Sequence, residues 1–317
     1  MKKVLGIDIG GTSVKAGLFS TEGVLERTAS TPTGNLANPE GFARIVALVR
    51  GLLEDGGATP SDLVGIGFDI PGPVDDAGRV GMLANIALDP DGLRGALQQE
   101  YPQVDPVFVN DANAAALGEL WKGAGLDARD FVLVAIGTGV GGGVVCGGQL
   151  VAGAFGAGGE LGHITVNRAE TASCGCGRRG CLEQYASASG IVRVYVDECA
   201  IRGIEPVQLK GPTDTLSVFE AYQGGDKAAQ AAISAMADAL GFALAQISAA
   251  IDPPLYLIGG GVSGGLPLFA DELEAAFRSY CLPVSSAARI APATLGNEAA
   301  MYGSAFTALR RCEAPRE

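Results

Sequence analysis

Hydrophobic positions along this chain follow two periods. Short apolar runs predict buried strands, and between them apolar residues recur at helical spacing, as Phe42, Ile45 and Val49 do. In the first part of the chain, the predicted strands are residues 3–9, 14–19, 24–29, 63–69 and 106–109, and the predicted helices are residues 39–54, about 92–100 and about 112–122. Because strands and helices alternate, we predict an α/β architecture with a largely buried sheet.

The same pattern restarts at Phe131. Residues 131–146 repeat the order of residues 4–19: a strand, a glycine-threonine turn and a second strand. Two such openings in a chain of 317 residues predict a duplicated fold of roughly two domains with a cleft between the halves. The pattern ends with a long alanine-rich helix that begins after Asp226 and ends before Pro253, a buried strand at residues 255–258 and a final helix at about 297–309.

The charge balance is strongly acidic. The chain carries 35 acidic and 22 basic side chains, a formal net charge of -13, and no basic run exceeds two residues. This field repels nucleic acid phosphates and anionic membranes, so we expect neither as a partner. It also repels ATP, so a nucleotide site must be built locally from Mg²⁺ and backbone dipoles. The 48 glycines gather in loops, which indicates backbone that approaches a ligand.

Cysteine usage and the start of the chain indicate the compartment. The chain has seven cysteines, and four of them, Cys146, Cys199, Cys281 and Cys312, lie outside any cluster. An odd and scattered count fits a reducing compartment. The chain runs from Met1 into a strand-like segment, and no apolar run reaches the ~18 residues needed to span a bilayer. We therefore expect a soluble cytoplasmic protein.

Asp8 interrupts an apolar predicted strand just before a turn formed by Gly10, Gly11 and Thr12. One interpretation is a hairpin in which Asp8 only caps backbone donors. We favour another, because an isolated buried carboxylate is costly unless it is paired or metal-bound. In that interpretation Asp8 binds Mg²⁺, directly or through water, and the turn binds phosphate through its amides and the Thr12 hydroxyl. Lys15 is either a further positive contact or a solvated lysine.

A second glycine turn, residues 137–142, formally fits the G-x-G-x-x-G dinucleotide fingerprint, and Glu160 lies about 20 residues beyond it. In that fingerprint the loop opens a helix, whereas residues 143–151 are strand-like, so we reject it. The Walker A sequence does not occur. Together with the first glycine-threonine turn, this turn is better interpreted as a second phosphate loop.

Asn110 and Asp111 stand at the carboxyl end of a predicted strand, immediately before a helix. In open α/β sheets that end of the strands is where ligands bind. The alternative is that one of the two residues is simply the helix N-cap, a common role for either. Adjacent asparagine and aspartate also form a pair suited to sugar hydroxyls, with a carboxylate able to accept a proton. The two phosphate loops favour this functional interpretation.

His163, the sole histidine, lies eleven positions before Cys174, and Cys176 and Cys181 complete a compact set of three thiols and one imidazole. Such a set matches tetrahedral zinc. The alternative is a group of buried or free thiols with a hydrogen-bonded histidine, because C-x-C spacing is less usual than C-x₂-C. The surrounding glycines let the backbone fold tightly around a metal, which favours zinc. Glu183 follows the last cysteine by two residues.

Six motifs occur in order along the chain, at residues 8–12, 71–75, 110–113, 137–163, 174–183 and 259–261. Together they resemble the ROK family (repressor, open reading frame, kinase), and within it the bacterial glucokinases most closely. The resemblance is collinear over nearly the whole chain. Six ordered motifs are far more specific than any single glycine loop.

The resemblance implies an actin-like ATPase fold. Two ribonuclease H-like α/β lobes would close an interlobe cleft around a sugar and ATP with Mg²⁺, and a structural zinc knot would belong to one lobe. We expect residues 1–112 and 298–317 to form the smaller N-terminal lobe, and residues 113–297 to form the larger C-terminal lobe with the zinc site. A homodimer or homotetramer is expected by the same resemblance.

The resemblance also implies roles for single residues. Asp111 matches the catalytic base, which takes the proton from the sugar 6-hydroxyl. The positions that match hexose contacts are Asn110, Glu160, His163 and Glu183, with Asn85 as a further candidate. The positions that match phosphate and magnesium contacts are Asp8, Gly10, Gly11, Thr12, Thr138 and Gly139, and those that match the adenosine loop are Gly260 and Gly261. The aromatic residue often found shortly after Asn85 in the family is absent here.

Two function classes remain. The first is ATP-dependent phosphorylation of a hexose, with glucose favoured and fructose, mannose, N-acetylglucosamine and N-acetylmannosamine as the other family substrates. The second is a sugar-sensing transcriptional regulator of the same family. Such regulators carry an N-terminal helix-turn-helix domain, whereas here the phosphate turn follows residue 8, and the net charge opposes DNA binding. A purely structural sugar-binding protein would not need Asp8 and Asp111 beside two phosphate loops.

Overall fold

A computed structural model describes residues 1–83 and 86–313. The chain divides into two compact units. Unit 1 comprises Met1–Arg129, Gly143–Gly159 and Asn297–Glu317, and unit 2 comprises Asp130–Gly142 and Glu160–Gly296. The lobe boundaries expected from the sequence, after residues 112 and 297, stay a prediction.

Unit 1 contains a five-stranded mixed sheet. Its strand order is β3 (Leu25–Pro32), β2 (Ser13–Ser20), β1 (Lys3–Ile9), β4 (Leu63–Ile70) and β5 (Val107–Asn110). Strands β1, β4 and β5 are parallel, and their register pairs Asp8 with Asp69 and Ile70 with Asn110. The carboxyl ends of the three parallel strands therefore meet at one edge of the sheet, where ligands bind in open α/β sheets.

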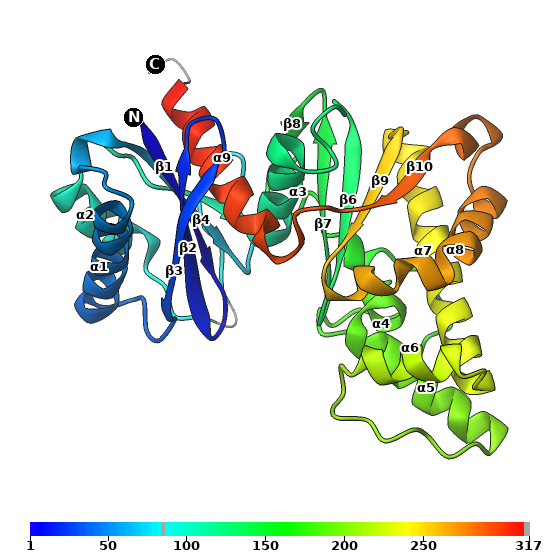
Figure 1. The fold of residues 1–317 in the computed structure, drawn as a ribbon. Helices are drawn as coiled ribbons and strands as arrows, with labels where there is room; N and C mark the ends of the chain where they lie inside the picture. The colour runs from blue at the N-terminus through cyan, green and yellow to red at the C-terminus, as the bar shows by residue number, and fades with distance from the viewer. Residues whose placement is uncertain (84–85, 314–317) are drawn as a thin grey trace. The chain divides into compact units, whose positions relative to one another are not determined.

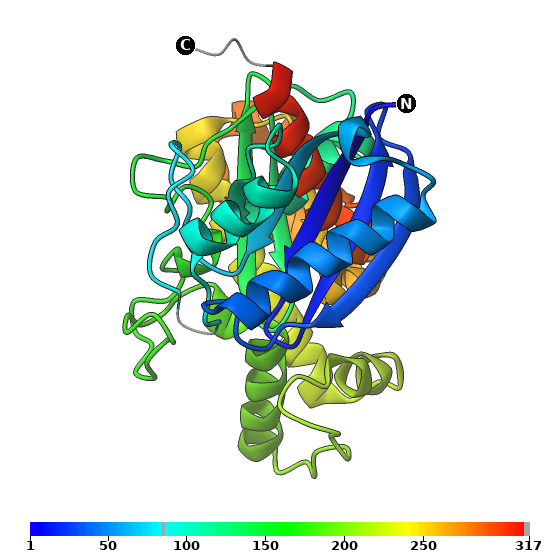
Figure 2. The ribbon, with the colours of Figure 1, turned by 90° about the vertical axis from the view of Figure 1, so that its left-hand side faces the viewer.

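Helices cover both faces of this sheet. Helices α1 (Pro39–Asp55) and α2 (Pro90–Glu100) lie across one face (Figures 1 and 2), and Ile45 and Leu97 belong to the core beneath them. Helices α3 (Asp111–Lys122) and α9 (Ala299–Glu313) pack against each other, and Met301 and Ala305 of α9 join Val4 in a core on the opposite face. The predicted largely buried sheet is confirmed for unit 1.

The second five-stranded sheet has the order β10 (Arg289–Pro292), β9 (Leu255–Gly259), β6 (Phe131–Ile136), β7 (Val140–Cys146) and β8 (Gln149–Leu150). Strand β9 is parallel to both β6 and β10. Strand β7 is antiparallel to β8, and the division between the two units falls within β7. The sequence predicted the strand at residue 131, the glycine-threonine turn after it and the second strand.

The helices of unit 2 are α4 (Glu183–Ala186), α5 (Ala188–Arg202), α6 (Thr215–Gln223), α7 (Lys227–Ile251) and α8 (Leu266–Tyr280). The Asp226 side chain caps α7 by accepting hydrogen bonds from the amides of Ala228 at 2.7 Å and Ala229 at 3.1 Å. This confirms the predicted N-cap. Among the described helices, α7 alone has the length and composition to cross a membrane, but 61% of its apolar window is buried inside the structure. It is a core helix of unit 2.

Short 3-10 helices connect several of these elements. They are η1 (Pro60–Asp62), η2 (Leu161–His163), η3 (Gly261–Gly265), η4 (Pro283–Ala287) and η5 (Gly296–Glu298). Two of them carry predicted site residues, because η2 ends at His163 and η3 begins at Gly261. The chain folds tightly at these two positions, as their glycine content favours.

Candidate functional site

The first glycine turn is held in place by a buried threonine. The Thr33 hydroxyl donates to the Gly10 carbonyl at 2.6 Å, and the Thr33 amide donates to the Thr12 carbonyl at 3.1 Å. Thr33 is 2% exposed, and Arg44 of α1 donates to its carbonyl at 2.5 Å. Gly11 and Thr12 themselves are exposed. The turn is thus fixed through its carbonyl oxygens while its tip stays open to solvent.

Asp8 is the penultimate residue of β1, next to this turn. Burial raises the pKa of its carboxyl group, while the neighbouring Asp69 carboxyl and the charge of Lys15 lower it. Lys15 is the cross-strand partner of Asp8 in β2 and is itself exposed. Lys15 therefore acts on Asp8 electrostatically from the solvent side.

Asp69 is a second carboxyl group at this edge, and it is not among the site residues predicted from the sequence. It is fully buried in β4, and neither of its carboxylate oxygens has a hydrogen-bond partner among the described residues. Burial, followed by the neighbouring carboxyl groups of Asp8 and Asp111, raises its pKa well above the ordinary value. The signal was present in the sequence, because Asp69 interrupts an apolar strand just as Asp8 does.

Asn110 and Asp111 join β5 to α3. The Asn110 side chain caps α3 by accepting from the Asn113 amide at 3.0 Å, which confirms the capping alternative for this residue. Its Nδ2 donates to Gly72 O and to Asp111 Oδ1, each at 3.1 Å. The Ala112 amide also donates to Asp111 Oδ1 at 2.8 Å. The Asp111 carboxylate is therefore oriented by two donors on the same oxygen.

The remaining candidate from this part of the chain is Asn85. It lies outside the described residues.

The second glycine turn joins β6 to β7 and carries Thr138 and Gly139. It is closed by a hydrogen bond from the Gly137 amide to the Gly139 carbonyl at 2.9 Å. A side chain at position 139 would place Cβ 2.5 Å from Glu183 Oε2, so any residue other than glycine would displace the Glu183 carboxylate. Thr138 is exposed, and its carbonyl accepts from the Ser189 hydroxyl at 3.3 Å.

The four predicted zinc ligands lie together. The side-chain ligand atoms of His163, Cys174, Cys176 and Cys181 are all within 4.8 Å of one another. Nδ1 of His163 is 3.9 Å from Sγ of Cys174, and the sulfur atoms of Cys176 and Cys181 are 3.7 Å apart. Tetrahedral zinc with ligands at ~2.3 Å requires ligand atoms about 3.8 Å apart. The donor set and its spacing fit a structural zinc ion.

Without a metal, the pKa values of the three thiols are shifted in different directions. Burial raises the pKa of Cys174, and it raises the pKa of Cys181 to about 12. The Arg178 backbone lowers the pKa of Cys176, which is exposed. Zinc binds the thiolate form, so metal binding would have to release the protons that burial retains on Cys174 and Cys181.

Residues 172–181, here called the zinc-site loop, are hydrogen-bonded to α4 through Gln184. This residue is not among those predicted from the sequence. The side-chain oxygen of Gln184 accepts from the amides of Gly180 at 2.8 Å and Cys181 at 3.2 Å, and its Nε2 donates to Ala172 O at 3.1 Å. A single side chain thus holds both ends of the loop that carries the cysteines.

The zinc-site loop is also tied to α5 through Glu170. Glu170 Oε2 accepts from the Tyr185 hydroxyl at 2.7 Å and pairs with Arg193 at 3.4 Å.

Two predicted sugar contacts, Glu160 and Glu183, border the zinc ligands, and a third, His163, is itself one of them. Nε2 of His163 faces Oε2 of Glu160 at 3.9 Å, on the opposite side of the ring from Cys174. Oε1 of Glu183 accepts from the Cys174 thiol at 3.7 Å. The two carboxylates and the imidazole are therefore brought into one neighbourhood in unit 2.

The third glycine loop follows β9. Gly260 has a φ of 81°, and a side chain there would place Cβ 2.3 Å from the Ile136 carbonyl oxygen. Glycine is required on both counts. The Gly260 carbonyl accepts from the amide and the hydroxyl of Ser263, which close the turn into η3 where Gly261 lies.

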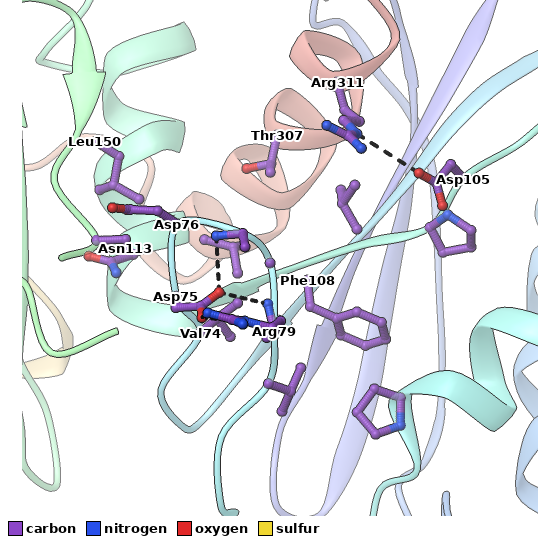
Figure 3. Close-up of a pocket in the computed structure, with 18 of the residues that line it drawn as sticks. Val74, Asp75, Asp76, Arg79, Asp105, Phe108, Asn113, Leu150, Thr307 and Arg311 are labelled. Atoms are coloured by element: carbon purple, nitrogen blue, oxygen red, sulfur yellow. Dashed lines mark hydrogen bonds and ion pairs between the residues drawn. The ribbon is translucent and has the colours of Figure 1, made fainter. Parts of the chain in front are cut away.

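A pocket of about 810 Å³ lies in unit 1 beside β5, the edge strand of the first sheet (Figure 3). Phe108, Asn113, Leu150 and Thr307 line it, together with the ion pair of Arg311 and Asp105 at 3.9 Å. Among the predicted site residues that the structure describes, none lines this pocket. The pocket is therefore separate from the two glycine turns predicted to bind phosphate.

The chain is similar to known proteins over nearly its whole length. The model of the ROK family matches residues 4–311. The chain is 36% identical to a glucokinase from Halalkalibacterium halodurans over 313 residues, which cover 95% of this chain and 93% of the relative. Among solved structures, it is similar to a ROK hexokinase from Thermus thermophilus, with a TM-score of 0.83, 31% identity and coverage of 98% and 99% of the two chains.

A second solved structure is a ROK family glucokinase from Streptomyces griseus in complex with glucose and AMPPNP. It is 32% identical to this chain, with a TM-score of 0.75, and the match covers 97% of this chain and 99% of that one. AMPPNP is an ATP analogue, so that complex holds both a sugar and a nucleotide.

Proposed function

This chain belongs to the ROK family, and from that membership we propose that it is an ATP-dependent glucokinase. The reaction transfers the γ-phosphoryl group of ATP to the 6-hydroxyl of glucose and yields glucose 6-phosphate and ADP. The carrying observation is the 36% identity to a glucokinase over 95% of the chain. Two solved relatives support it, a ROK hexokinase and a ROK family glucokinase, the second with glucose and AMPPNP bound.

Asp111 is the proposed general base. As the 6-oxygen attacks the γ-phosphorus, the O–P bond to the new acceptor forms, the bond to the β-phosphate oxygen breaks, and the hydroxyl proton passes to the Asp111 carboxylate. The donors from Ala112 and Asn110 orient this carboxylate at the start of α3. Phosphoryl transfer asks mainly for positioning and charge stabilisation, so one oriented carboxylate suffices as a base.

The phosphate groups are assigned to the two glycine turns. Gly10, Gly11 and Thr12 would bind them in unit 1, and Thr138 and Gly139 would bind them in unit 2. Mg²⁺, when bound with ATP, neutralises charge that develops on the transferred group. Asp8 would hold that ion, directly or through water, with Lys15 as an outer positive charge. Gly260 and Gly261 would form the adenosine loop.

The glucose hydroxyls are assigned to Asn110 in unit 1 and to Glu160, His163 and Glu183 in unit 2, with Asn85 as a further contact. Zinc would be structural. With Nδ1 of His163 on the metal, Nε2 is left for a sugar hydroxyl, and this fits the observed approach of Nδ1 to Cys174 and of Nε2 to Glu160.

The cellular setting is part of the same proposal. We place the protein in the cytoplasm as a homodimer or homotetramer that binds no nucleic acid and no membrane. The test of the function is a coupled ADP-release assay with glucose, fructose, mannose, N-acetylglucosamine and N-acetylmannosamine. Glucose should give the highest kcat/KM. A higher value for another sugar would reassign the substrate, and no ADP release with any of them would remove the kinase assignment.

A further inference from the structure

Asp69 has no role in the reaction as described above, yet it stands beside the proposed magnesium ligand. It pairs with Asp8 in the register of β1 and β4, which are parallel, so the two side chains leave the sheet on the same face. Neighbouring strands lie about 4.7–4.9 Å apart, so the two side chains are direct neighbours across the β1–β4 pairing. Position 69 therefore adds a second carboxyl group to the neighbourhood of Asp8.

The surroundings of Asp69 do not compensate a negative charge. Its side chain is fully buried, and neither oxygen receives a hydrogen bond from any described residue. The nearby Ser304 hydroxyl donates to the Met301 carbonyl at 3.1 Å. The lysine of this edge, Lys15, is exposed and acts on Asp8. Asp69 is therefore a buried carboxyl group without a hydrogen-bond donor, and it lies beside the carboxyl group of Asp8.

The unfavourable burial of the Asp69 charge can be relieved in two ways. Burying a carboxylate without a partner is strongly unfavourable, so the pair must take up either a proton or a cation. Mg²⁺ is usually held in kinase sites by one or two carboxylates together with substrate phosphates and water. Asp8 is partly exposed and Asp69 is not, so a cation arriving from solvent would meet Asp8 first.

We propose that Asp69 is a second protein carboxylate for the divalent cation, acting together with Asp8. This inference rests on the proposed kinase function, because it concerns the cation that accompanies ATP. It has a consequence that a single carboxylate would not have: the protein binds the cation before the nucleotide arrives. Two carboxylates also hold the cation in a fixed position relative to the first glycine turn.

The test is direct binding of Mn²⁺, the paramagnetic substitute for Mg²⁺, to the zinc-loaded protein without sugar or nucleotide. Free Mn²⁺ is measured by electron paramagnetic resonance during titration of the natural protein, of Asp69→Asn, and of the control Asp105→Asn, which removes an exposed carboxylate in the same unit. We expect one Mn²⁺ per chain in the natural protein and in the control, and at least about tenfold weaker binding in Asp69→Asn.

Two results would overturn the inference: no Mn²⁺ bound by the natural protein without nucleotide, or equal affinity in Asp69→Asn. Either would mean that the pair carries a proton instead. Asp69→Ser repeats the measurement with a smaller neutral side chain in case the amide disturbs the fold. The proposed function is judged separately, because a natural protein that phosphorylates glucose while Asp69→Asn keeps its Mn²⁺ affinity contradicts only the inference.

Discussion

The backbone amide of Val140 donates a hydrogen bond to Oε2 of Glu183 at 3.1 Å. The other oxygen of the same carboxylate accepts from the Cys174 thiol at 3.7 Å. One side chain at the start of α4 thus joins the second glycine turn to the zinc ligands. A residue assigned to the sugar is also a structural support for a turn assigned to phosphate.

Glu183→Gln should therefore affect both substrates. The amide keeps the size of the side chain but loses the charge that accepts from Val140 and that would accept from a sugar hydroxyl. A hydrogen bond to a charged group contributes about 1.5–3 kcal/mol, so we expect KM for glucose to rise roughly 10- to 100-fold. KM for ATP should rise by a smaller factor. Steady-state kinetics with each substrate varied in turn provides the measurement.

The matched control for this change is Glu205→Gln, which removes an exposed carboxylate in unit 2. It should leave both KM values unchanged. If Glu183→Gln altered only KM for ATP, the sugar contact of Glu183 would be withdrawn and its support of the glycine turn retained.

Asp111→Asn should separate binding from chemistry. The amide preserves the shape at the start of α3 but cannot take the proton. A positioned general base typically contributes 10²–10⁴-fold, so kcat should fall by about that factor while the Kd for glucose, measured by calorimetry, changes only a few-fold. Asp127→Asn, an exposed change in the same unit, serves as the control. A variant with near-natural kcat would remove Asp111 as the base.

Metal analysis should find about one zinc ion per chain. Cys176→Ser removes one of the four ligands, so it should lose the metal and weaken glucose binding together, because the same loop presents His163 to the sugar. Cys281→Ser, outside the ligand set, should keep both. Zinc-free natural protein after careful preparation would contradict the metal assignment, and metal loss with an unchanged KM for glucose would uncouple the loop from the sugar site.

Thr33→Val should loosen the first glycine turn. The change keeps the side-chain shape but deletes the 2.6 Å hydrogen bond to the Gly10 carbonyl and leaves that carbonyl without its buried donor. We expect a loss of about 1–3 kcal/mol in the free energy of unfolding and a raised KM for ATP, with KM for glucose little changed. Thr33→Ser retains the hydroxyl and should restore most of the ATP affinity. Equal KM values for ATP in Thr33→Val and the natural protein would count against the role of Thr33 in positioning the turn.

The hydrogen bond from Tyr185 to Glu170, with help from the Ala172 amide and the charge of Arg193, lowers the pKa of Glu170. A lowered pKa in the folded state stabilises the protein above the unfolded value of about 4.3, and this contribution disappears as the pH falls through the lowered value. Glu170→Gln should therefore cost about 1 kcal/mol in the free energy of unfolding at pH 7 and progressively less below about pH 4.

Denaturant titrations of both proteins between pH 3 and pH 7, on the order of one pH unit apart, would measure that difference. Glu220→Gln, on the exposed side of α6, should show no difference at any of these pH values. A penalty for Glu170→Gln that stayed constant down to pH 3 would mean that its packing, rather than its charge, holds the zinc-site loop.

Much of the fold could be predicted from residues close together in the sequence. The charged residue Asp226 and the proline pair after residue 252 bracket α7, and both limits follow from the chemistry of helix ends. Helix α5 gave no such signal, because apolar residues occur on both its buried and its solvent sides: Ile191 is fully buried, whereas Val196 is 40% exposed and Ile201 is 75% exposed. An amphipathic period cannot be recognised in that pattern.

In the candidate site, too, some residues are recognisable from the local sequence and others only from contacts between distant segments. The four zinc ligands lie within the 19 consecutive positions from His163 to Cys181, and their residue types and clustering were recognisable in the sequence. Asp69 interrupts an apolar strand as Asp8 does, but its place beside Asp8 depends on the pairing of β4 with β1, which are separated by a hairpin and a helix in the chain. The support of the glycine turn by Thr33 is likewise a contact between distant segments. Pairing of this kind follows from the assembled sheet rather than from any local pattern.

His163 is the only histidine in the chain, and its two ring nitrogens face different partners, Cys174 on one side and Glu160 on the other. In a nitrogen-15 spectrum of the labelled protein, the imidazole region would hold a single pair of resonances with no background. One of them would report the metal and the other the sugar. Metal loading and glucose binding can therefore be followed separately in the same sample, each through its own nitrogen resonance of His163.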